Sequence, residues 1–235
     1  MTSRIATPLL ARVVPDDIVV EEFRTDPDGI VLHPDEEALI ARSVPERRRE
    51  FTTGRHCAHR ALERLGRPAP AILPDPKGSP HWPTAVVGSI THCAGYRAAA
   101  VAGTARVRSL GIDATPNDPL PEGVLEAIGL PAERRRVQEH LAAHPSVRWD
   151  RILFSAKESI YKTWYPLVRR SLGFEEADME FRPDTEFRPG RDAADEGSFT
   201  ARILPLVPEP GFPRQLSGRY AVRDGLVLTA ITLRP

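Results

Sequence analysis

The amino-acid sequence predicts an α+β fold whose sheets are antiparallel. A helical segment followed by short strands occurs twice along the 235 residues. The strands within each group lie only a few residues apart, whereas parallel neighbours need a crossover of a dozen or more residues. The pair Asp224-Gly225, which separates the last two expected strands, is also typical of a tight hairpin turn.

Hydrophobic periodicity and turn residues place the individual elements. The expected helices cover residues 35–43, 45–65, 122–128, 132–143 and 149–168. The expected strands cover residues 85–90, 97–102, 107–114, 178–182, 198–204, 217–223 and 226–233. A loop rich in proline and glycine spans 67–83, and we expect a solvated excursion over 183–197. The second group of elements begins near residue 108.

Charge and composition exclude several classes of function. Lys+Arg and Asp+Glu both number 32, which argues against a nucleic-acid binder that neutralises phosphates with a basic surface. No stretch of about twenty apolar residues is present, so we expect no membrane partner. Cys57 and Cys93 fit neither a disulfide framework nor a zinc spacing. We therefore expect a cytoplasmic protein with two reduced thiols.

Lysine is scarce, because arginine outnumbers it 29 to 3. The three lysines are Lys77, Lys157 and Lys162. Lys77 lies in a Pro/Gly-rich turn, and the other two lie close together in the expected helix 149–168. A compact ammonium suits point contacts with phosphate oxygens. The placement therefore indicates contacts with phosphate, with chance placement as the alternative.

Four polar groups are candidates for chemistry. They are residues 88–92 (GSITH), residues 111–115 (GIDAT), residues 154–162 (FSAKESIYK), and the helix face formed by Arg48, Thr52, Arg55 and His59. Each has an ordinary structural explanation when taken alone. A histidine at a strand end is often structural, an aspartate there is often a turn former, and an arginine face is usually solvated. Glu158 and Lys162 have the spacing of a surface i,i+4 ion pair.

The order and spacing of these groups resemble the 4′-phosphopantetheinyl transferases that activate surfactin and enterobactin synthetases. That family carries G-S-x-[ST]-H, then G-I-D-x-E, then [FW]-x-x-K-E-[AS]-x-x-K on a helix. The first and third motifs are intact here. The resemblance also includes residues 47–56 (RRREFTTGRH) and a K-G-x-P turn at residues 77–80, so it spans about residues 40–170.

The resemblance implies two similar α/β halves related by a pseudo-twofold axis, with coenzyme A between them. Residues 1–108 would form the half on the 3′-phosphate and adenine side. Residues 109–235 would form the half with the metal and the catalytic helix. Short single-chain members of this kind serve polyketide, peptide and fatty-acyl synthases. A duplicated chain does not need a partner copy to form its cleft, so we expect a monomer.

The resemblance also implies the site residues. The expected contacts of coenzyme A are Arg47, Arg55, Lys77, Gly78, Ser89, Thr91, His92, Lys157 and Lys162. Helical periodicity favours Arg48 beside Arg55, whereas the family pattern favours Arg47. The implied ligands of Mg²⁺, with Mn²⁺ as the alternative ion, are Asp113, Thr115 and Glu158. The implied catalytic residues are Glu158, Lys162 and His92, and Glu158 or a water that it orients would take the proton of the acceptor serine.

Thr115 departs from the family, which has a glutamate at this position. A threonine hydroxyl is a neutral and weak ligand for Mg²⁺, so the site loses one negative charge. Water, the pyrophosphate, the Ala114 carbonyl and Asp118 are the candidates that would fill its place. This departure motivates an alternative function, a non-catalytic module that binds coenzyme A or a carrier protein.

The expected reaction has two products, the holo form of an acyl or peptidyl carrier protein and adenosine 3′,5′-bisphosphate. The carrier is expected to present an acidic helix to arginines of the second half, such as Arg169 and Arg170. A metal-dependent hydrolase that uses His92, Asp113 and Glu158 is a further alternative. It lacks a second histidine at ligand spacing.

Overall fold

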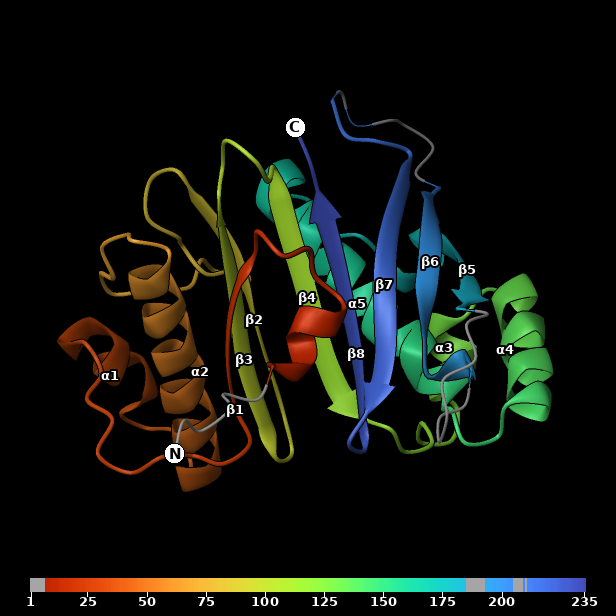
Figure 1. Ribbon diagram of the computed structural model, residues 1–235, viewed down its shortest axis with the longest axis horizontal. Helices are drawn as coiled ribbons and strands as arrows, with labels where there is room; N and C mark the ends of the chain where they lie inside the picture. Colours follow the sequence, from red (N-terminus) through yellow and green to blue (C-terminus); the bar gives the residue numbers. More distant parts are fainter. Residues whose placement is uncertain (1–6, 185–192, 205–208, 210) are drawn as a thin grey trace.

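The computed structural model describes residues 7–184, 193–204, 209 and 211–235, which form two antiparallel sheets (Figure 1). The first sheet has the strand order β1-β3-β2, and the second has the order β4-β8-β7-β6-β5. The first contains β1 (Val19–Phe23), β2 (Val86–Cys93) and β3 (Tyr96–Gly103). The second contains β4 (Ser109–Pro116), β5 (Ala177–Pro183), β6 (Glu196–Ile203), β7 (Gln215–Arg223) and β8 (Leu226–Leu233). The predicted α+β fold with antiparallel sheets is confirmed.

A long helix packs on each sheet. The helix α2 (Pro45–Arg64) covers the first sheet, and α5 (Trp149–Val168) covers the second (Figure 1). Each of these two helices has 20 residues. The apolar stripe of α2 packs on β3, where Ala58 and Leu62 join Val101 in one core. The two halves therefore repeat one arrangement, in agreement with the expected pair of similar α/β halves.

The helix α5 approaches β4 very closely at Gly111. A Cβ at this position would collide with the Ser159 carbonyl oxygen and with the Thr163 hydroxyl. Only glycine allows this approach of strand to helix. The glycine of the GIDAT motif therefore brings Asp113, two residues further along the same face of β4, against the middle of α5.

The two sheets meet along β2 and β4. The Ile112 backbone N–H donates to Ser89 Oγ at 3.1 Å, and the Ala114 N–H donates to Thr91 Oγ1 at 2.9 Å. Side-chain hydroxyls of β2 thus accept the bonds that a strand of the same sheet would accept through its carbonyls. The hydroxyl residues of the GSITH motif therefore join the two halves.

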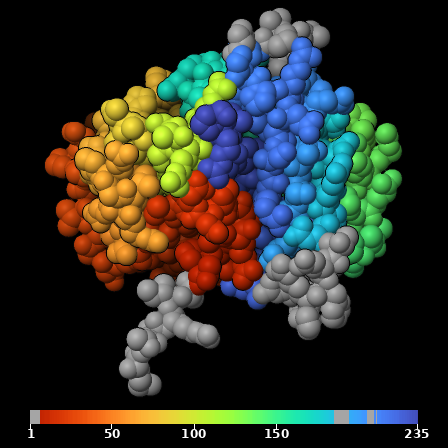
Figure 2. Space-filling view, turned by 45° about the horizontal axis from the view of Figure 1, so that its top comes forward, coloured from red at the N-terminus to blue at the C-terminus, as the bar shows by residue number. Residues whose placement is uncertain are grey.

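A shared core covers this join on the face away from the long helices. Ile112 and Leu228 of the second sheet pack there with Ala100 of the first sheet. The segment before β1 completes this core through Leu10 and Val13. Figure 2 shows red atoms of this N-terminal part lying against both the yellow-green atoms and the blue atoms. The halves are therefore held together by apolar packing as well as by the hydroxyl bonds.

The smaller elements differ from the prediction in detail. They are α1 (Pro34–Ile40), α3 (Val124–Ile128), α4 (Pro131–Ala143) and the 3₁₀ turns η1 (Leu9–Arg12), η2 (Phe174–Glu176) and η3 (Ala193–Asp195).

The strand β1 was not predicted, because it contains two consecutive glutamates. One of them, Glu22, accepts hydrogen bonds from the Leu9 and Leu10 N–H groups and from the Tyr96 hydroxyl. The carboxylate of Glu22 is therefore hydrogen-bonded within the fold.

Two expected loops have different outcomes. Residues 67–83 contain no helix and only an isolated bridge between Pro74 and Pro80, as expected. The centre of the expected excursion 183–197 lies outside the described residues, and its ends belong to β5, η3 and β6. The expected boundary between residues 108 and 109 falls where β4 begins. Among the helices of the described ranges, none is long and apolar enough to cross a membrane.

Candidate active site

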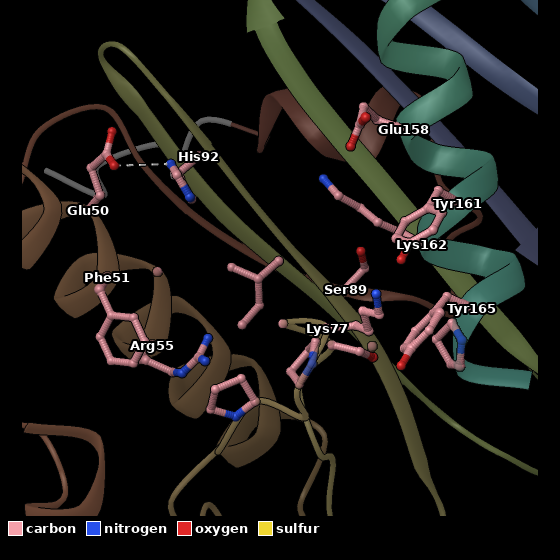
Figure 3. Close-up of a pocket in the computed structure, with 18 of the residues that line it drawn as sticks. Glu50, Phe51, Arg55, Lys77, Ser89, His92, Glu158, Tyr161, Lys162 and Tyr165 are labelled. Carbon is pink, nitrogen blue, oxygen red and sulfur yellow. Dashed lines mark ion pairs between the residues drawn. The ribbon is translucent and has the colours of Figure 1, made fainter. Parts of the chain in front are cut away.

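A cavity of about 390 Å³ lies between α2 and α5, with β2 and the 74–80 loop completing its wall (Figure 3). Most of the expected coenzyme A contacts line it. The expected site residues in this lining are Arg47, Arg55, Lys77, Gly78, Ser89, His92, Glu158 and Lys162. Four arginine or lysine side chains thus face one cavity, whereas Glu50 and Glu158 are the acidic residues of the lining. This charge balance suits a ligand with several phosphates.

Arg55 is a buried cation in the wall of this cavity. Its side chain is 9% exposed, it lies over the Phe51 ring, and its Nε has no hydrogen-bond partner among the described residues. The Glu36 carboxylate is 3.9 Å from that nitrogen. Burial lowers the pKa of Arg55 to about 10, although Glu36 opposes the shift. A largely buried guanidinium in the lining of a cavity is suited to an anionic ligand.

Arg47, Glu50 and His92 form one cluster at the start of α2. Arg47 Nη1 lies 3.0 Å from His92 Nε2, and Glu50 Oε2 lies 3.4 Å from His92 Nδ1. Burial lowers the pKa of His92, with Arg47 and Lys162 adding to the shift and Glu50 opposing it. The lower pKa agrees with an Nε2 that accepts the Arg47 hydrogen bond.

Arg48 points away from the cavity. It donates to the Ile40 carbonyl at 2.9 Å and to Glu37 at 2.6 Å. The structure therefore brings Arg47 to the cavity wall in the place that helical periodicity had given to Arg48. The periodicity argument was wrong because α2 faces the cavity through Arg47, Phe51 and Arg55 at the spacing i, i+4, i+8.

Lys162 is paired with β4. Its Nζ lies 2.7 Å from Asp113 Oδ1 and 3.0 Å from the Ile112 carbonyl oxygen. The i,i+4 ion pair with Glu158 is not formed, and Glu158 has no hydrogen bond or ion pair with the described residues. Asp113 also accepts a hydrogen bond from Ser155 Oγ at 2.8 Å. A carboxylate without a partner thus stands next to one that is held in place.

Asp113 and Glu158 are the two carboxylates that could bind a divalent cation at this site. Burial raises the pKa of Glu158, and the charge of Asp113 raises it further against the opposing effect of Lys162. Thr115 is buried on the same face of β4 as Asp113, since side chains alternate along a strand. Where the chain is described, no group of three His, Cys, Asp or Glu side chains could hold a metal.

Two carboxylates and a hydroxyl are all oxygen donors, which Mg²⁺ prefers. A cation would also offset the repulsion between Asp113 and Glu158. The residues therefore fit Mg²⁺, provided that a ligand phosphate and water complete its coordination.

Lys157 lies in a different setting from Lys162, with its ammonium buried among hydrogen-bond partners of the protein. Its side chain is 1% exposed, and Nζ donates to Glu133 at 2.8 Å and to the carbonyls of Ile128, Phe174 and Ala177 at 2.6–3.0 Å. Lys157 does not line the cavity between α2 and α5, although it is among the residues that line a smaller cavity beside it. Five residues along a helix correspond to a rotation of about 140°, so Lys157 and Lys162 point in different directions. The ammonium joins α5 to α3, α4, η2 and β5.

Thr91 also differs from its expected role. Its hydroxyl accepts the Ala114 N–H and lies 3.3 Å from Asp113 Oδ1, and its side chain is not part of the cavity lining. Ser89 does line the cavity, but its hydroxyl is already bonded to the Ile112 N–H. The Ser89 hydroxyl accepts that bond through its oxygen, so its own O–H can still donate to a ligand in the cavity.

Sequence reasoning missed part of the cavity wall. Tyr161 and Tyr165 line it, and their rings stack at a centroid distance of 5.6 Å. Together with Glu158 and Lys162 they occupy the positions i, i+3, i+4 and i+7, so helical periodicity could have found them. A second, smaller cavity of about 220 Å³ adjoins the first, because Glu158 and Tyr161 line both. Its other lining residues are mostly apolar and include Leu172 and Phe174.

Two similar α/β halves that enclose a cationic cavity with paired carboxylates form a site for a phosphate-bearing substrate. Comparison with protein families identifies the family to which the chain belongs. Residues 35–102 match the 4′-phosphopantetheinyl transferase N-terminal domain, and residues 109–204 match the 4′-phosphopantetheinyl transferase superfamily. The chain belongs to the 4′-phosphopantetheinyl transferase superfamily.

Three relatives match this chain along nearly its whole length. The 4′-phosphopantetheinyl transferase PptT of Mycobacterium tuberculosis is 49% identical over 96% of this chain and 98% of its own length. The transferase Svp of Streptomyces mobaraensis is 48% identical over 96% of this chain and 89% of its own. Npt of Nocardia iowensis is 45% identical over 95% of this chain and 99% of its own. The activity of the chain is transfer of 4′-phosphopantetheine from coenzyme A to carrier proteins.

Proposed function

We propose that the cavity between α2 and α5 is the coenzyme A site and that Asp113, Glu158 and Lys162 form its reaction centre. One observation carries this proposal. A cavity lined by four arginines and lysines also has the carboxylate of Glu158 in its lining, and Asp113, which is outside the lining, is near enough for its charge to raise the pKa of Glu158. Cations bind the phosphates of the substrate, and the carboxylates bind a divalent cation and receive a proton.

The N-terminal half would hold the 3′-phosphate and adenine side of coenzyme A. Arg47 and Arg55 come from α2, and Lys77 comes from the loop that closes the cavity. Arg55 lines the cavity as a largely buried guanidinium, so its positive charge would act on the phosphate oxygens in a poorly solvated setting. His92 adds an imidazole that is neutral in the free protein near pH 7 because its pKa is lowered.

The C-terminal half would hold the pyrophosphate. Asp113 and Glu158 are the carboxylates that would bind Mg²⁺, and Thr115 is the third oxygen donor on this face. Bound there, the ion supplies positive charge to the phosphate oxygens. Lys162 is 26% exposed and lies next to the same carboxylates, so its ammonium is within the cavity to neutralise the leaving phosphate. Mn²⁺ is the alternative ion for these ligands.

The transfer step then follows from the positions of these groups. The serine hydroxyl of the carrier attacks the phosphorus that bears the pantetheine arm, and a new O–P bond forms. The bond from that phosphorus to the bridging oxygen breaks, and its electron pair remains on adenosine 3′,5′-bisphosphate. Glu158 takes the serine proton, directly or through a water, since it is a carboxylate of the cavity lining without a hydrogen bond or ion pair among the described residues. Lys162 stabilises the charge that grows on the leaving group.

The smaller cavity is the proposed place of the pantetheine arm. Glu158 and Tyr161 line both cavities, so a chain leaving the pyrophosphate passes directly from one to the other. The apolar side chains of Leu172 and Phe174 suit the methyl and methylene groups of the arm. The expected site residues bind phosphates, the metal or the reacting groups, and this cavity adds a place for the pantetheine arm.

A transfer assay tests the proposed function. The native chain is incubated with coenzyme A that carries a labelled pantetheine arm, Mg²⁺ and several apo-carrier proteins, and the label on the carrier is measured. Label on the carrier serine, dependent on Mg²⁺, supports the proposal. Binding of coenzyme A without transfer would support the non-catalytic module, and release of free phosphopantetheine without a carrier would support the hydrolase.

The cellular setting belongs to the same proposal. We expect a cytoplasmic monomer, because both halves of the cavity come from one chain and neither cysteine is paired in a disulfide. Acyl or peptidyl carrier domains are the protein partners, and nucleic acids and membranes are not expected to bind. Light scattering at working concentrations measures the oligomeric state.

A further inference from the structure

The loop that carries Lys77 is organised by one aspartate. Asp75 Oδ1 accepts the Lys77 N–H at 2.9 Å and the Ser79 N–H at 3.0 Å. The backbone closes the same turn, since the Asp75 N–H donates to the Ser79 carbonyl and the Gly78 N–H donates to the Asp75 carbonyl. Gly78 has φ +86°, a conformation that favours glycine. The position of Lys77 therefore depends on the Asp75 side chain.

The other oxygen of Asp75 reaches the opposite half of the protein. Arg169 Nη1 donates to Asp75 Oδ2 at 2.8 Å. Arg169 ends α5 in the left-handed conformation, with φ +58°, and its guanidinium lies 5.7 Å from the centre of the Tyr165 ring. The Asp75 side chain is only 6% exposed, whereas Arg169 is 56% exposed. A single carboxylate thus joins the Lys77 turn to the end of α5.

Tyr165 strengthens this connection. It lines the cavity, and burial together with the Asp75 carboxylate raises the pKa of its hydroxyl. The pKa of Asp75 is lowered: burial opposes the shift, while the Lys77 and Ser79 N–H groups, Tyr165 and Arg169 all favour the charged form. Figure 3 shows Lys77 and Tyr165 close together at one side of the cavity.

We propose that Asp75 is a positioning residue that clasps the Lys77 turn to α5 through Arg169 and so holds Lys77 against the 3′-phosphate of coenzyme A. This inference rests on the proposed coenzyme A site. Arg169 would then act inside the enzyme, whereas the sequence had suggested it as a carrier contact. Its neighbour Arg170 instead pairs with Glu209 at 3.1 Å and lies over the Trp164 ring.

The clasp predicts which part of the substrate is affected. Asp75 touches no phosphate in this arrangement, and it acts through Lys77. Loosening it should therefore weaken binding of coenzyme A but not of 3′-dephospho-coenzyme A, which lacks the group that Lys77 contacts. Turnover at saturating coenzyme A should stay near the native value, because Lys162 and Glu158 are not in contact with Asp75.

The experiment compares Asp75→Asn, Arg169→Ala and Lys77→Ala with the control Arg170→Ala. Calorimetry measures the Kd of each for coenzyme A and for 3′-dephospho-coenzyme A, and kinetics measure kcat and KM. We expect the first three to weaken coenzyme A binding about tenfold. Binding of the dephospho ligand should change less than about twofold, and Arg170→Ala should bind coenzyme A as the native protein does, since Arg170 is not in the cavity lining.

Additional variants separate a local effect from misfolding. Asp75→Asn retains a side-chain oxygen that can accept a hydrogen bond from the turn, and Arg169 lies outside the turn. Circular dichroism and thermal unfolding of both variants show whether either of them is misfolded. The double variant Asp75→Asn/Arg169→Ala should be no weaker than Asp75→Asn alone, because both remove one connection.

Three results would overturn the clasp. They are equal losses for both ligands, no loss for either, or additive losses in the double variant. If the native chain itself binds no coenzyme A, the proposed function fails. If native binding is normal and Asp75→Asn matches it, only the clasp fails.

Discussion

The ammonium of Lys162 lies 2.7 Å from Asp113 and makes no ion pair with Glu158, although Glu158 is four residues earlier on the same helix. The reason is the close contact of α5 with β4, which brings a buried carboxylate and the Ile112 carbonyl within reach of the ammonium. Lys162 thereby neutralises one carboxylate of the proposed metal site in the free protein. Glu158 is left with a raised pKa and no partner among the described residues.

Replacing Lys162 by Ala should affect the chemical step more than substrate binding. Charge on the leaving phosphate grows in the transition state, so the ammonium contributes most there. We expect kcat to fall about 10²- to 10³-fold, as for the loss of one preorganised donor, while the Kd of coenzyme A changes only a few-fold. Single-turnover transfer and calorimetry measure the two quantities. An equal loss in affinity and in kcat/KM would mean that Lys162 holds the ground state only.

Replacing Thr115 by Glu should raise the affinity for Mg²⁺. Thr115 shares a face of β4 with Asp113, so a longer acidic side chain adds a charged oxygen next to the two carboxylates. A Mg²⁺ titration of pantetheine transfer measures the effect, and Thr115→Gln is the neutral control of similar length. If Thr115→Glu needs as much Mg²⁺ as the native chain or more, another group already occupies that coordination position.

Replacing Asp113 by Ala should abolish transfer at ordinary Mg²⁺ concentrations. The variant removes one of the two carboxylates of the proposed metal site and leaves Lys162 without its ion-pair partner. The same Mg²⁺ titration, with a thermal unfolding scan to confirm that the variant folds, measures this. An active Asp113→Ala protein would contradict the assignment of the metal site.

Replacing Lys157 by Met should destabilise the fold. The change leaves Glu133 as a buried charge without its cation, which costs about 3–5 kcal/mol. Adding Glu133→Leu should recover much of that loss, since it removes the unpaired charge. Urea unfolding of native, single and double variants gives the free energies of unfolding. If Lys157→Met is as stable as the native chain but binds coenzyme A poorly, the result would support the contact of Lys157 with coenzyme A that the resemblance implies.

Binding of coenzyme A should be coupled to proton uptake at His92. Burial holds the pKa of His92 below its usual value of about 6.5, so the free imidazole is neutral at pH 7. A nearby phosphate favours the charged form and raises the pKa in the complex. Affinity should therefore increase as the pH falls from about 8 towards 6. Calorimetry in buffers of different ionisation enthalpy counts the protons.

The variant His92→Gln isolates this contribution, because the phosphates of the ligand also titrate near pH 6. It should take up fewer protons than the native chain. Equal proton uptake by both proteins would show that His92 stays neutral in the complex.

The sequence by itself determined the fold class, the two long helices and the family. Apolar residues repeated at helical spacing in 45–65 and 149–168, and both segments became 20-residue helices. The motifs also led to the residues that line the cavity, including Arg55, Lys77 and Glu158. These features are local in the chain: periodicity, turn residues and motif spacing are set by neighbouring positions.

The tertiary structure alone decided which groups are paired. Lys157 and Lys162 are both lysines of one motif, yet one is buried against Glu133 and the other faces Asp113 of a distant strand. Thr91 bonds to β4, and Asp75 reaches Arg169 across 94 positions of the chain. Such contacts depend on how α2, α5 and the two sheets are packed. Helical spacing fixes which side chains share a face, but packing determines which partner that face meets.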